Sequence, residues 1–403
     1  MDKTCDVVVV GAGPAGLVAA QITAKAGLKT IVYEKNEAIG IPIRSSGGSW
    51  ISDLSQLGIP AEFYHPIGQI KVITGKQAAS FAYPKPMACV LDVRRLYQYL
   101  GEQAVASGAA IQLKTHVDRP LINEGILGGV ISKGGKMGDE EATLSKIVID
   151  ASGYAGLIGK RAGANPGYKS FGFGAEYDLY APDYDETEAY LFLGSVTAPN
   201  GYGWAFPYGH HRVRLGVGVM RPNTHIDPRD YLDRLLSATP DLSRCFRRAS
   251  PIEFHIGLFP VYPPVGRKFV QDGLVMVGDA AGQGSSLLGE GIRYAIASGK
   301  MAGQVVVDAF TAQNFTERFL KSYERQWKAA FLKDSAIAYW IGQRIARFSD
   351  QDWDNLMPFL GKLTPYQMAM GLKCDFNLGW LASAFLHNPV IALKILSRVK
   401  LPG

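Results

Sequence analysis

Short, unbroken apolar runs recur along the chain, and each is followed by a glycine or an acidic residue. They cover residues 7–10, 30–33, 147–149 and 274–277. Runs of this length without polar alternation are typical of strands that are buried on both faces of a parallel sheet. Helical patterns follow at residues 17–26, 92–108 and 291–312. Strands that alternate with helices predict an α/β fold.

Residues 168–267 have a different pattern, in which apolar and polar positions alternate between aromatic and proline-rich turns. Residues 212–219 are one example. Such alternation predicts an antiparallel sheet layered over the first lobe. From residue 315 onward the pattern becomes helical and rich in Trp, Phe and Leu.

We therefore predict an α/β fold in three parts. A discontinuous Rossmann-like lobe comprises residues 1–75, 92–167 and 268–312. An inserted antiparallel-sheet substrate domain comprises residues 76–91 and 168–267, and a C-terminal helical region comprises residues 313–403. A chain of 403 residues is longer than one hydrophobic core usually serves, which agrees with several lobes.

Composition favours a folded enzyme in a reducing compartment. Apolar residues make up 47% of the chain, enough for large buried cores. The formal net charge of +6 is mild and the basic residues are scattered, so we expect no nucleic-acid partner. Four cysteines lie far apart without a CxxC pair or a His cluster, which predicts free thiols and no metal site. We expect a cytoplasmic protein, because the first strand leaves no room for a signal peptide and no apolar stretch reaches the roughly 18 residues of a membrane span.

The first chemical motif joins a strand to a glycine-rich turn in residues 7–16. Three glycines at this spacing let the backbone approach a pyrophosphate, and the N-terminus of the following helix favours the anion. Glu34 ends the next strand, where an acid binds a ribose hydroxyl. The order of these features predicts a dinucleotide cofactor, bound by Gly11, Gly13, Pro14, Ala15, Gly16, Glu34 and Lys35.

Two further strand ends carry polar turns. One is Asp150-Ala-Ser-Gly153, and the other is Gly278-Asp279-Ala-Ala-Gly282. Because parallel sheets bind ligands at the carboxyl ends of their strands, both turns are candidates for the cofactor site.

A strand-like segment rich in aromatic residues lies in the middle of the chain. It reads Pro199-Asn-Gly-Tyr202-Gly-Trp204-Ala-Phe206-Pro207. Its alternating rings either pack on a core as ordinary sheet residues or form a wall for an apolar substrate.

Together these motifs resemble the geranylgeranyl reductase family, within the FAD-dependent group that includes aromatic hydroxylases. The resemblance covers about the first 310 residues, and segment 199–207 fits the family's PxxYxWxFP pattern at every fixed position. It implies an FAD-binding lobe of the glutathione-reductase or hydroxylase type. Gly278 and Asp279 then match the motif that contacts the ribityl chain or pyrophosphate. Residues matching the turn that faces the pyrimidine edge of the flavin are Gly289, Gly291 and Ile292.

The resemblance also implies a tunnel for an isoprenoid chain beside the flavin. Its predicted substrate-binding residues are Tyr202, Trp204, Phe206 and Pro207. Some family members carry a cysteine after a G-x-P turn, where this chain has Ser45. A serine is less acidic than a thiol, so the thiol's role in proton supply does not transfer. Tyr202 and Ser45 are the catalytic candidates, and the sequence Ser285-Ser286-Leu287-Leu288 departs from the family's Pro and Thr-Gly, which leaves the loop geometry open.

Several polar residues have two interpretations. Ser45 and Ser46 are predicted to contact FAD, as is Arg94 or its neighbour at the start of a helix. Arg44 either neutralises the pyrophosphate or caps a surface loop. We expect Glu290 and Arg293 to pair with each other rather than to act in catalysis, and His210 and His211 to lie at an exposed turn rather than to relay a proton.

The leading hypothesis is an FAD-dependent oxidoreductase that reduces isolated C=C bonds of a geranylgeranyl or other prenyl chain, on a prenyl lipid or prenyl diphosphate. Reduced flavin N5 supplies the hydride to a bond held in a dry slot. Electrons come from NAD(P)H or from a small electron-donor protein, and the lack of a second complete GxGxxG argues against a separate nicotinamide lobe. The main alternative is a flavin monooxygenase, either a hydroxylase or an epoxidase. Others are a flavin-dependent isomerase or cyclase and a non-catalytic flavin-binding membrane partner, and the halogenase motif WxWxIP is absent.

The C-terminus carries a basic and apolar pattern. Residues 376–403 contain no acid, and Asn388-Pro389 is typical of a helix start. The predicted helix either docks on the protein core or lies on an anionic bilayer, which would make the protein peripheral to a membrane.

Overall fold

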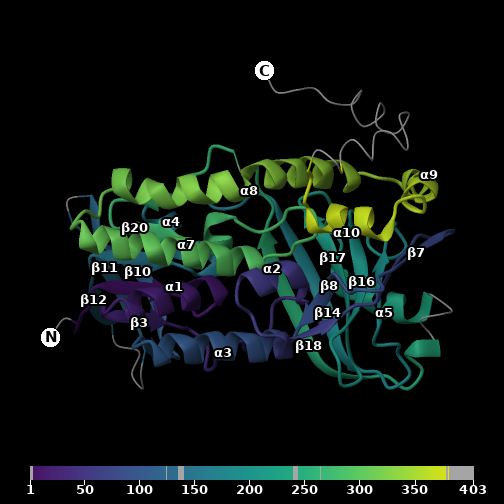
Figure 1. Cartoon of the computed structure of the whole chain (residues 1–403), viewed down its shortest axis with the longest axis horizontal. Coiled ribbons are helices and arrows are strands. Elements are labelled where there is room, and N and C mark those ends of the chain that lie inside the picture. The colour runs from purple at the N-terminus through teal and green to yellow at the C-terminus, as the bar shows by residue number, and fades with distance from the viewer. Residues whose placement is uncertain are drawn as a thin grey trace.

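The computed structural model describes residues 3–123, 125–134, 140–238, 244–263, 265–377 and 380. Figure 1 shows an elongated molecule, in which a lobe of mixed helices and strands adjoins a lobe dominated by one large sheet. Helices α1 (Pro14–Lys25), α3 (Val93–Ala106) and α7 (Ile292–Thr311) cover the first lobe, and α8 (Glu317–Ile345) runs along the molecule's long axis.

The first lobe is centred on a six-stranded sheet. Its strands in order are β19 (Val270–Gln271), β20 (Leu274–Met276), β13 (Ile147–Asp150), β2 (Val7–Val10), β3 (Thr30–Tyr33) and β9 (Ala110–Gln112). All neighbours pair in parallel except β19 and β20. Every residue of β2, β3, β13 and β20 is buried, which confirms the prediction of parallel strands covered on both faces.

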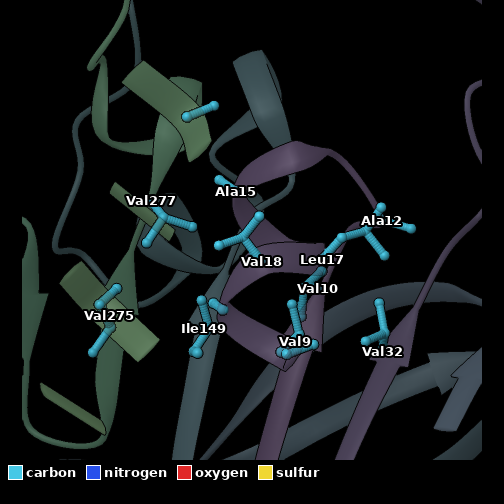
Figure 2. Close-up of a cluster of buried hydrophobic side chains, with 14 of the residues drawn as sticks. Val9, Val10, Ala12, Ala15, Leu17, Val18, Val32, Ile149, Val275 and Val277 are labelled. Atoms are coloured by element: carbon cyan, nitrogen blue, oxygen red, sulfur yellow. The ribbon is translucent and has the colours of Figure 1, made fainter. Parts of the chain in front are cut away.

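Close helix packing covers this sheet. Figure 2 shows Val9, Ile149 and Val275 from three neighbouring strands beneath Leu17 and Val18 of α1. A Cβ atom on Gly299 of α7 would lie 2.4 Å from the Ala15 carbonyl oxygen, so glycine lets α7 approach α1 closely. The helix over residues 92–108 is confirmed as α3, and the side chain of Asp92 caps it by accepting from the Arg95 N–H.

Two small sheets flank this lobe. One contains β1 (Lys3–Thr4), β12 (Glu140–Leu144), β11 (Ile126–Lys133) and β10 (His116–Asn123); the other contains β4 (Gly48–Trp50), β8 (Ala88–Leu91) and β5 (Tyr64–Pro66). Short helices complete the lobe: α2 (Ile51–Gln56), α4 (Leu157–Arg161) and the 3₁₀ turns η1 (Ala61–Phe63), η2 (Gly153–Ala155) and η3 (Gly278–Ala281).

The second lobe is a seven-stranded sheet. Its order is β18 (Ser250–Pro260), β14 (Phe171–Tyr180), β17 (Arg212–Arg221), β16 (Gly201–Pro207), β15 (Glu188–Phe192), β6 (Gln69–Ile73) and β7 (Ala78–Ala82). All pairs are antiparallel except β15 with β6. Helix α5 (Pro228–Ala238) packs on its outer face through Leu232 and Leu235, so the inner face is left for the site.

The boundary predicted at residue 75 differs from the structure. β6 and β7 form one hairpin on either side of that residue, and β6 also pairs with β15. β8, which was predicted to join the substrate domain, instead pairs with β4 and β5. The physical reason is that a short strand joins whichever edge its backbone can reach, and local alternation does not specify that edge.

Helices dominate the C-terminal part, as predicted. After α8 come α9 (Asp350–Leu360) and α10 (Pro365–Lys373), both of which start with a capping box. Met357 of α9 and Met368 of α10 pack into the core beside β6 and β7. The predicted terminal helix after Asn388 lies outside the described residues, and no helix within the described part is long and apolar enough to cross a membrane.

Candidate active site

In the turn after β2, Gly11 and Gly16 lie close to backbone atoms, whereas Gly13 faces open space. A Cβ atom on Gly11 would lie 2.4 Å from the Ala151 carbonyl oxygen, and one on Gly16 would lie 2.2 Å from the Gly11 carbonyl oxygen. Gly11 also has a φ of +106°, which favours glycine. A Cβ on Gly13 meets no atom within 4 Å, and no side chain caps α1. Free space in front of an uncapped helix N-terminus suits a pyrophosphate.

Glu34 stands at the edge of this space. The residue is buried, and its Oε2 atom accepts from the Ala12 N–H at 2.9 Å while Oε1 accepts from the Asn36 N–H at 2.9 Å. Each carboxylate oxygen accepts up to two hydrogen bonds, so Oε2 retains capacity for a ribose hydroxyl. Pro14 and Ala15 form the buried first turn of α1, whereas the neighbouring side chain of Lys35 is exposed.

Asp279 follows β20 in the turn η3. The structure shows no hydrogen bond to its carboxyl group from the described residues, and burial raises the pKa of Asp279 to about 6. A Cβ on Gly291 would lie 3.6 Å from the Asp279 Oδ1 atom, so the carboxyl group faces the start of α7. A half-buried acid without donors suits a hydroxyl-bearing ligand. Asp150, in contrast, already accepts from the N–H groups of Ser152 and Gly159, and therefore holds its own turn.

A tight turn leads into α7. Gly289 has a φ of +70°, and Gly291 is the N-cap residue without a side-chain cap before Ile292. The Tyr202 hydroxyl donates to the Leu288 carbonyl oxygen at 2.5 Å and so ties this turn to β16. The helix N-terminus presents backbone N–H groups and a partial positive charge, which stabilise an anion.

A cavity lies between this turn, the strand β4 and the inner face of the seven-stranded sheet. Its apolar wall is formed by Trp50, Ile67, Ile70, Val90, Leu191, Phe206 and Leu372. Its polar groups come from Ser45, Ser46, Ser49, Cys89, Tyr202 and Glu290. Only the fold brings these residues together, since they come from segments hundreds of residues apart.

The aromatic segment 199–207 is strand β16, and its side chains differ in role. Tyr202 and Phe206 line the cavity, and Trp204 is 8% exposed beside them. The Trp204 Nε1–H donates to Glu176 Oε2 at 3.1 Å. Pro207 is buried at the end of the strand. The wall is therefore partly a cavity surface and partly packed core, so both sequence interpretations hold in part.

The loop before β4 carries the predicted serines. Ser45 Oγ accepts from the Gly47 N–H at 3.3 Å, and the Ser46 carbonyl oxygen accepts from Arg214 at 2.8 Å. Arg44 is exposed. Arg94 donates to both carboxylate oxygens of Glu253, at 2.9 and 3.0 Å, which joins α3 to β18.

Two expectations about charged residues are confirmed. Glu290 and Arg293 pair, because the Arg293 Nε–H donates to both Glu290 oxygens at 2.9 Å. Burial raises the pKa of Glu290, although Arg293 opposes this shift. Arg293 also pairs with Asp53 of α2. His210 and His211 are exposed at the turn between β16 and β17.

Sequence patterns missed several residues around the site. Ser49 donates to Glu290 Oε1 at 3.0 Å, and Leu372 of α10 lines the cavity. Glu176 and His255 lie behind Trp204 on β14 and β18. No motif marks them, since each takes its place through strand register or helix docking alone.

Four features lie along one edge of the six-stranded sheet. They are the open space at Gly13 (the cradle), the Glu34 oxygen that can accept a further hydrogen bond, the Asp279 carboxyl group without a donor among the described residues, and the start of α7 without a side-chain cap. This donor and acceptor set fits FAD. Fold and site together define an FAD-dependent oxidoreductase.

Comparison with known proteins identifies the family within this class. A model of FAD-dependent oxidoreductases matches residues 6–169, and a model of the geranylgeranyl reductase catalytic domain matches residues 172–258. Digeranylgeranylglycerophospholipid reductase 2 of Methanopyrus kandleri is 32% identical over 89% of this chain and 90% of its own length. The enzyme of the same name from Methanothermobacter thermautotrophicus is 31% identical over 87% and 90%. The chain belongs to the geranylgeranyl reductase family.

Solved structures agree with the fold. A geranylgeranyl bacteriochlorophyll reductase-like protein from Thermoplasma acidophilum superimposes with a TM-score of 0.86 at 25% identity, over 99% of this chain and all of that one. A flavin-dependent brominase superimposes with a TM-score of 0.71 at 18% identity, over 98% of this chain and all of that one, which shows a shared fold. The predicted enzyme class, an FAD-dependent oxidoreductase of the geranylgeranyl reductase type, is thereby confirmed, and the monooxygenase alternative is the weaker one.

Proposed function

We propose that this protein reduces C=C bonds in the geranylgeranyl chains of a glycerophospholipid. The observation that carries the proposal is the apolar cavity between β16 and the turn at Gly289, since an isoprenoid chain has no polar atoms and is held by burial. The curated relatives are named as digeranylgeranylglycerophospholipid reductases, which supports a glycerophospholipid headgroup on the substrate. A prenyl diphosphate is the other substrate form that the same cavity suits.

Cofactor contacts follow from the cradle. We assign the pyrophosphate to Gly11, Gly13, Pro14, Ala15 and Gly16, the ribose to Glu34, and the ribityl chain to Asp279. Gly289, Gly291 and Ile292 would face the pyrimidine edge of bound FAD, Ser45 and Ser46 would lie beside its ring, and Gly278 would belong with Asp279 to the ribityl or pyrophosphate contact. Arg44, Lys35 and Arg94 remain predicted contacts at the periphery, and of these Arg94 is already held by Glu253.

Bound reduced FAD supplies a hydride to the alkene. The chain's own residues exclude water from the bond and hold the proton that completes the reduction. Ser45 and Tyr202 are the proposed catalytic residues, since both carry a hydroxyl and both residues line the cavity. Tyr202 also donates to the Leu288 carbonyl oxygen in this structure and so holds the turn in addition to its proposed catalytic role. Phe206 provides an aromatic side of the slot, and Trp204 packs against Phe206 and Tyr202 behind it. Pro207 remains a predicted substrate contact at the end of the strand.

The first test is anaerobic incubation of dithionite-reduced protein with a digeranylgeranyl glycerophospholipid and with geranylgeranyl diphosphate. Mass gains in steps of two hydrogens establish alkene reduction, and the preferred substrate identifies the headgroup. No gain without oxygen, followed by a gain of one oxygen atom on aeration, would transfer the assignment to a monooxygenase.

A variant tests the slot itself. Trp204→Ala is expected to raise KM at least ten-fold with FAD still bound, because the aromatic wall contacts substrate rather than cofactor. FAD content from absorbance and KM from product formation are the two measurements. Loss of FAD in this variant contradicts the assignment of β16 to the substrate slot.

Electron supply and membrane contact complete the proposal. NAD(P)H or a small redox protein is proposed as the electron donor. Anaerobic bleaching of the flavin absorbance by each candidate tests this proposal.

The acid-free C-terminal segment is proposed to contact an anionic membrane. Flotation of the full chain with anionic vesicles, lost in a chain that ends at Phe385, would support that contact; equal flotation of both chains contradicts it.

A further inference from the structure

A row of side chains crosses the inner face of the seven-stranded sheet. The strand register places His255 of β18 opposite Glu176 of β14, Glu176 opposite Gly216 of β17, and Gly216 opposite Trp204 of β16. Residues in one row of a sheet point to the same face, so these side chains are neighbours although they are up to 79 residues apart.

Glycines form the floor on which Trp204 lies. Cβ atoms on Gly216, Gly218 and Gly174 would lie 2.2, 3.2 and 3.4 Å from the indole ring. The indole therefore lies across the sheet, where larger residues would lift it into the cavity. The glycines support one face of the indole and the rings of Tyr202 and Phe206 pack against it, but these apolar contacts leave the buried Nε1–H in need of an acceptor.

Glu176 supplies that acceptor, and hydrogen bonds continue from it to the surface. The Trp204 Nε1–H donates to Glu176 Oε2, and the other oxygen, Oε1, bonds His255 Nδ1 at 2.9 Å. His255 Nε2 bonds Glu253 Oε2 at 2.9 Å, and Glu253 pairs with Arg94. Trp204, Glu176 and His255 are all less than 10% exposed.

His255 bonds a carboxylate through each ring nitrogen. A neutral imidazole has a single N–H, so only the imidazolium donates to both carboxylates. Burial by itself lowers the pKa of His255, but the hydrogen bonds to Glu176 and Glu253 more than reverse this, and the pKa ends above its ordinary value of 6.5.

Other charges around the imidazole have their own partners. Arg214 of β17 opposes protonation, and it donates to the Ser46 and Leu91 carbonyl oxygens. Asp178 of β14 lies within 4.8 Å of the cluster, and it accepts from Tyr208 and Arg212. Arg94 of α3 faces Glu253. The protonated imidazole of His255 therefore lies between the carboxylates of Glu176 and Glu253 and donates to both.

We propose that Glu176 and His255 are positioning residues that fix the indole of Trp204 and thereby set the shape of the substrate slot. The inference rests on the proposed function in so far as the slot holds a prenyl chain. Glu176, His255 and Trp204 are not among the described residues that line the cavity, but the Trp204 ring packs against the lining residues Tyr202 and Phe206, so Glu176 and His255 act on the slot through Trp204. Above the pKa of His255 one of its two hydrogen bonds is lost, two carboxylates face each other, and the anchor of Trp204 weakens.

The test begins with a readout that needs no substrate. In ¹⁵N-tryptophan-labelled, FAD-loaded protein, the Trp204 indole N–H signal is assigned through Trp204→Phe and followed with pH. The signal is expected to shift as the pH rises above 6.5 in the wild type and to lose this titration in His255→Gln. Glu176→Gln is expected to move it to the position of a weaker hydrogen bond. An indole signal that is unchanged by both variants overturns the anchor.

Kinetics then test the consequence for the slot. Loss of a hydrogen bond to a charged group is expected to raise KM for the prenyl substrate about ten-fold in Glu176→Gln and His255→Gln, with kcat changed much less. Glu188→Gln is the matched control, since Glu188 pairs with Lys71 and Tyr190 in the same sheet without touching Trp204. Equal KM values in wild type and both variants overturn the proposal. A wild type that reduces no prenyl substrate refutes the proposed function, while the indole signal still decides the anchor.

Discussion

Gly13 and Gly16 stand three positions apart in one motif, yet they meet different surroundings. The position of a Cβ on Gly13 is open, and that on Gly16 lies against the Gly11 carbonyl oxygen. Gly13 also has an ordinary backbone conformation, with φ of −79°. One glycine therefore makes room for a ligand and the other makes room for the protein's own backbone.

Valine at the two positions separates these roles. Gly13→Val is expected to fold with nearly wild-type thermal stability as apoprotein but to lose FAD, because its side chain enters the pyrophosphate space. Gly16→Val is expected to lose about 1–3 kcal/mol of apoprotein stability through overpacking. Flavin absorbance and thermal unfolding measure both effects. Wild-type FAD affinity in Gly13→Val contradicts the assigned cradle.

Asp279 predicts a pH dependence of the apoprotein. Burial raises its pKa from 3.8 to about 6, so the folded state binds a proton more tightly than the unfolded state does. Its contribution to stability is therefore greatest at low pH and is lost as the pH rises from about 4 to 6. Asp279→Asn is expected to unfold at a higher temperature than wild type at pH 7.5 and to lose this advantage near pH 4. Equal melting temperatures at pH 7.5 contradict a half-buried Asp279 carboxylate without a partner.

At the scale of elements, Arg293 ties three helices together at the site. Its guanidinium pairs with Glu290 before α7 and with Asp53 of α2, and it donates to the Lys373 carbonyl oxygen at the end of α10 at 2.7 Å. Lys373 in turn pairs with Asp53 at 2.6 Å. This network fixes the turn that carries Gly289 and Gly291.

Removal of this guanidinium is expected to be costly. Arg293→Met leaves the largely buried Glu290 carboxylate without its cation and removes one of the two cations that pair with Asp53, and the expected loss is about 3–5 kcal/mol of unfolding free energy. Lys321→Met, which breaks the exposed pair of Lys321 with Glu317 on α8, is the control and is expected to cost less than about 1 kcal/mol. Urea unfolding of the two variants gives the comparison. A similar small loss in both would show that the network does not hold the helices.

The strands were easier to predict from the sequence than the strands with which they pair. Buried runs such as Val7–Val10 specify a strand by their own composition. The edge that β6 or β8 joins depends on contacts with β15 or with β4 and β5, and these lie elsewhere in the chain. Local periodicity therefore predicted the elements, while the domain boundary near residue 75 required the fold.

At the scale of the whole molecule, the chain passes repeatedly between its two lobes. It crosses from β5 to β6, returns from β7 to β8, crosses again from α4 to β14 and returns from β18 to β19. The cavity lies between the lobes and takes residues from both. Neither lobe is a continuous segment that completes its own core.

This connectivity predicts cooperative unfolding. Calorimetry of the FAD-loaded protein is expected to show a single transition, stabilised by about 2.7 kcal/mol when free FAD is at 100 times its Kd. A separate lower transition of the seven-stranded sheet, unaffected by FAD, contradicts the coupling of the lobes.

The sequence by itself determined the features that depend on a few neighbouring residues. These include the glycine turn after β2, the acid at position 34, the second turn at Gly278 and the aromatic pattern of β16. Their physics is local, because φ preferences, helix starts and the two-residue repeat of a strand act within one short segment.

Tertiary structure alone decided which side chains complete the site. Glu176 and His255 reach Trp204 through strand register, and Leu372 reaches the cavity through the docking of α10. A shift of one residue in either strand would turn these side chains to the opposite face. Such choices depend on burial summed over the whole sheet, which no short stretch of sequence contains.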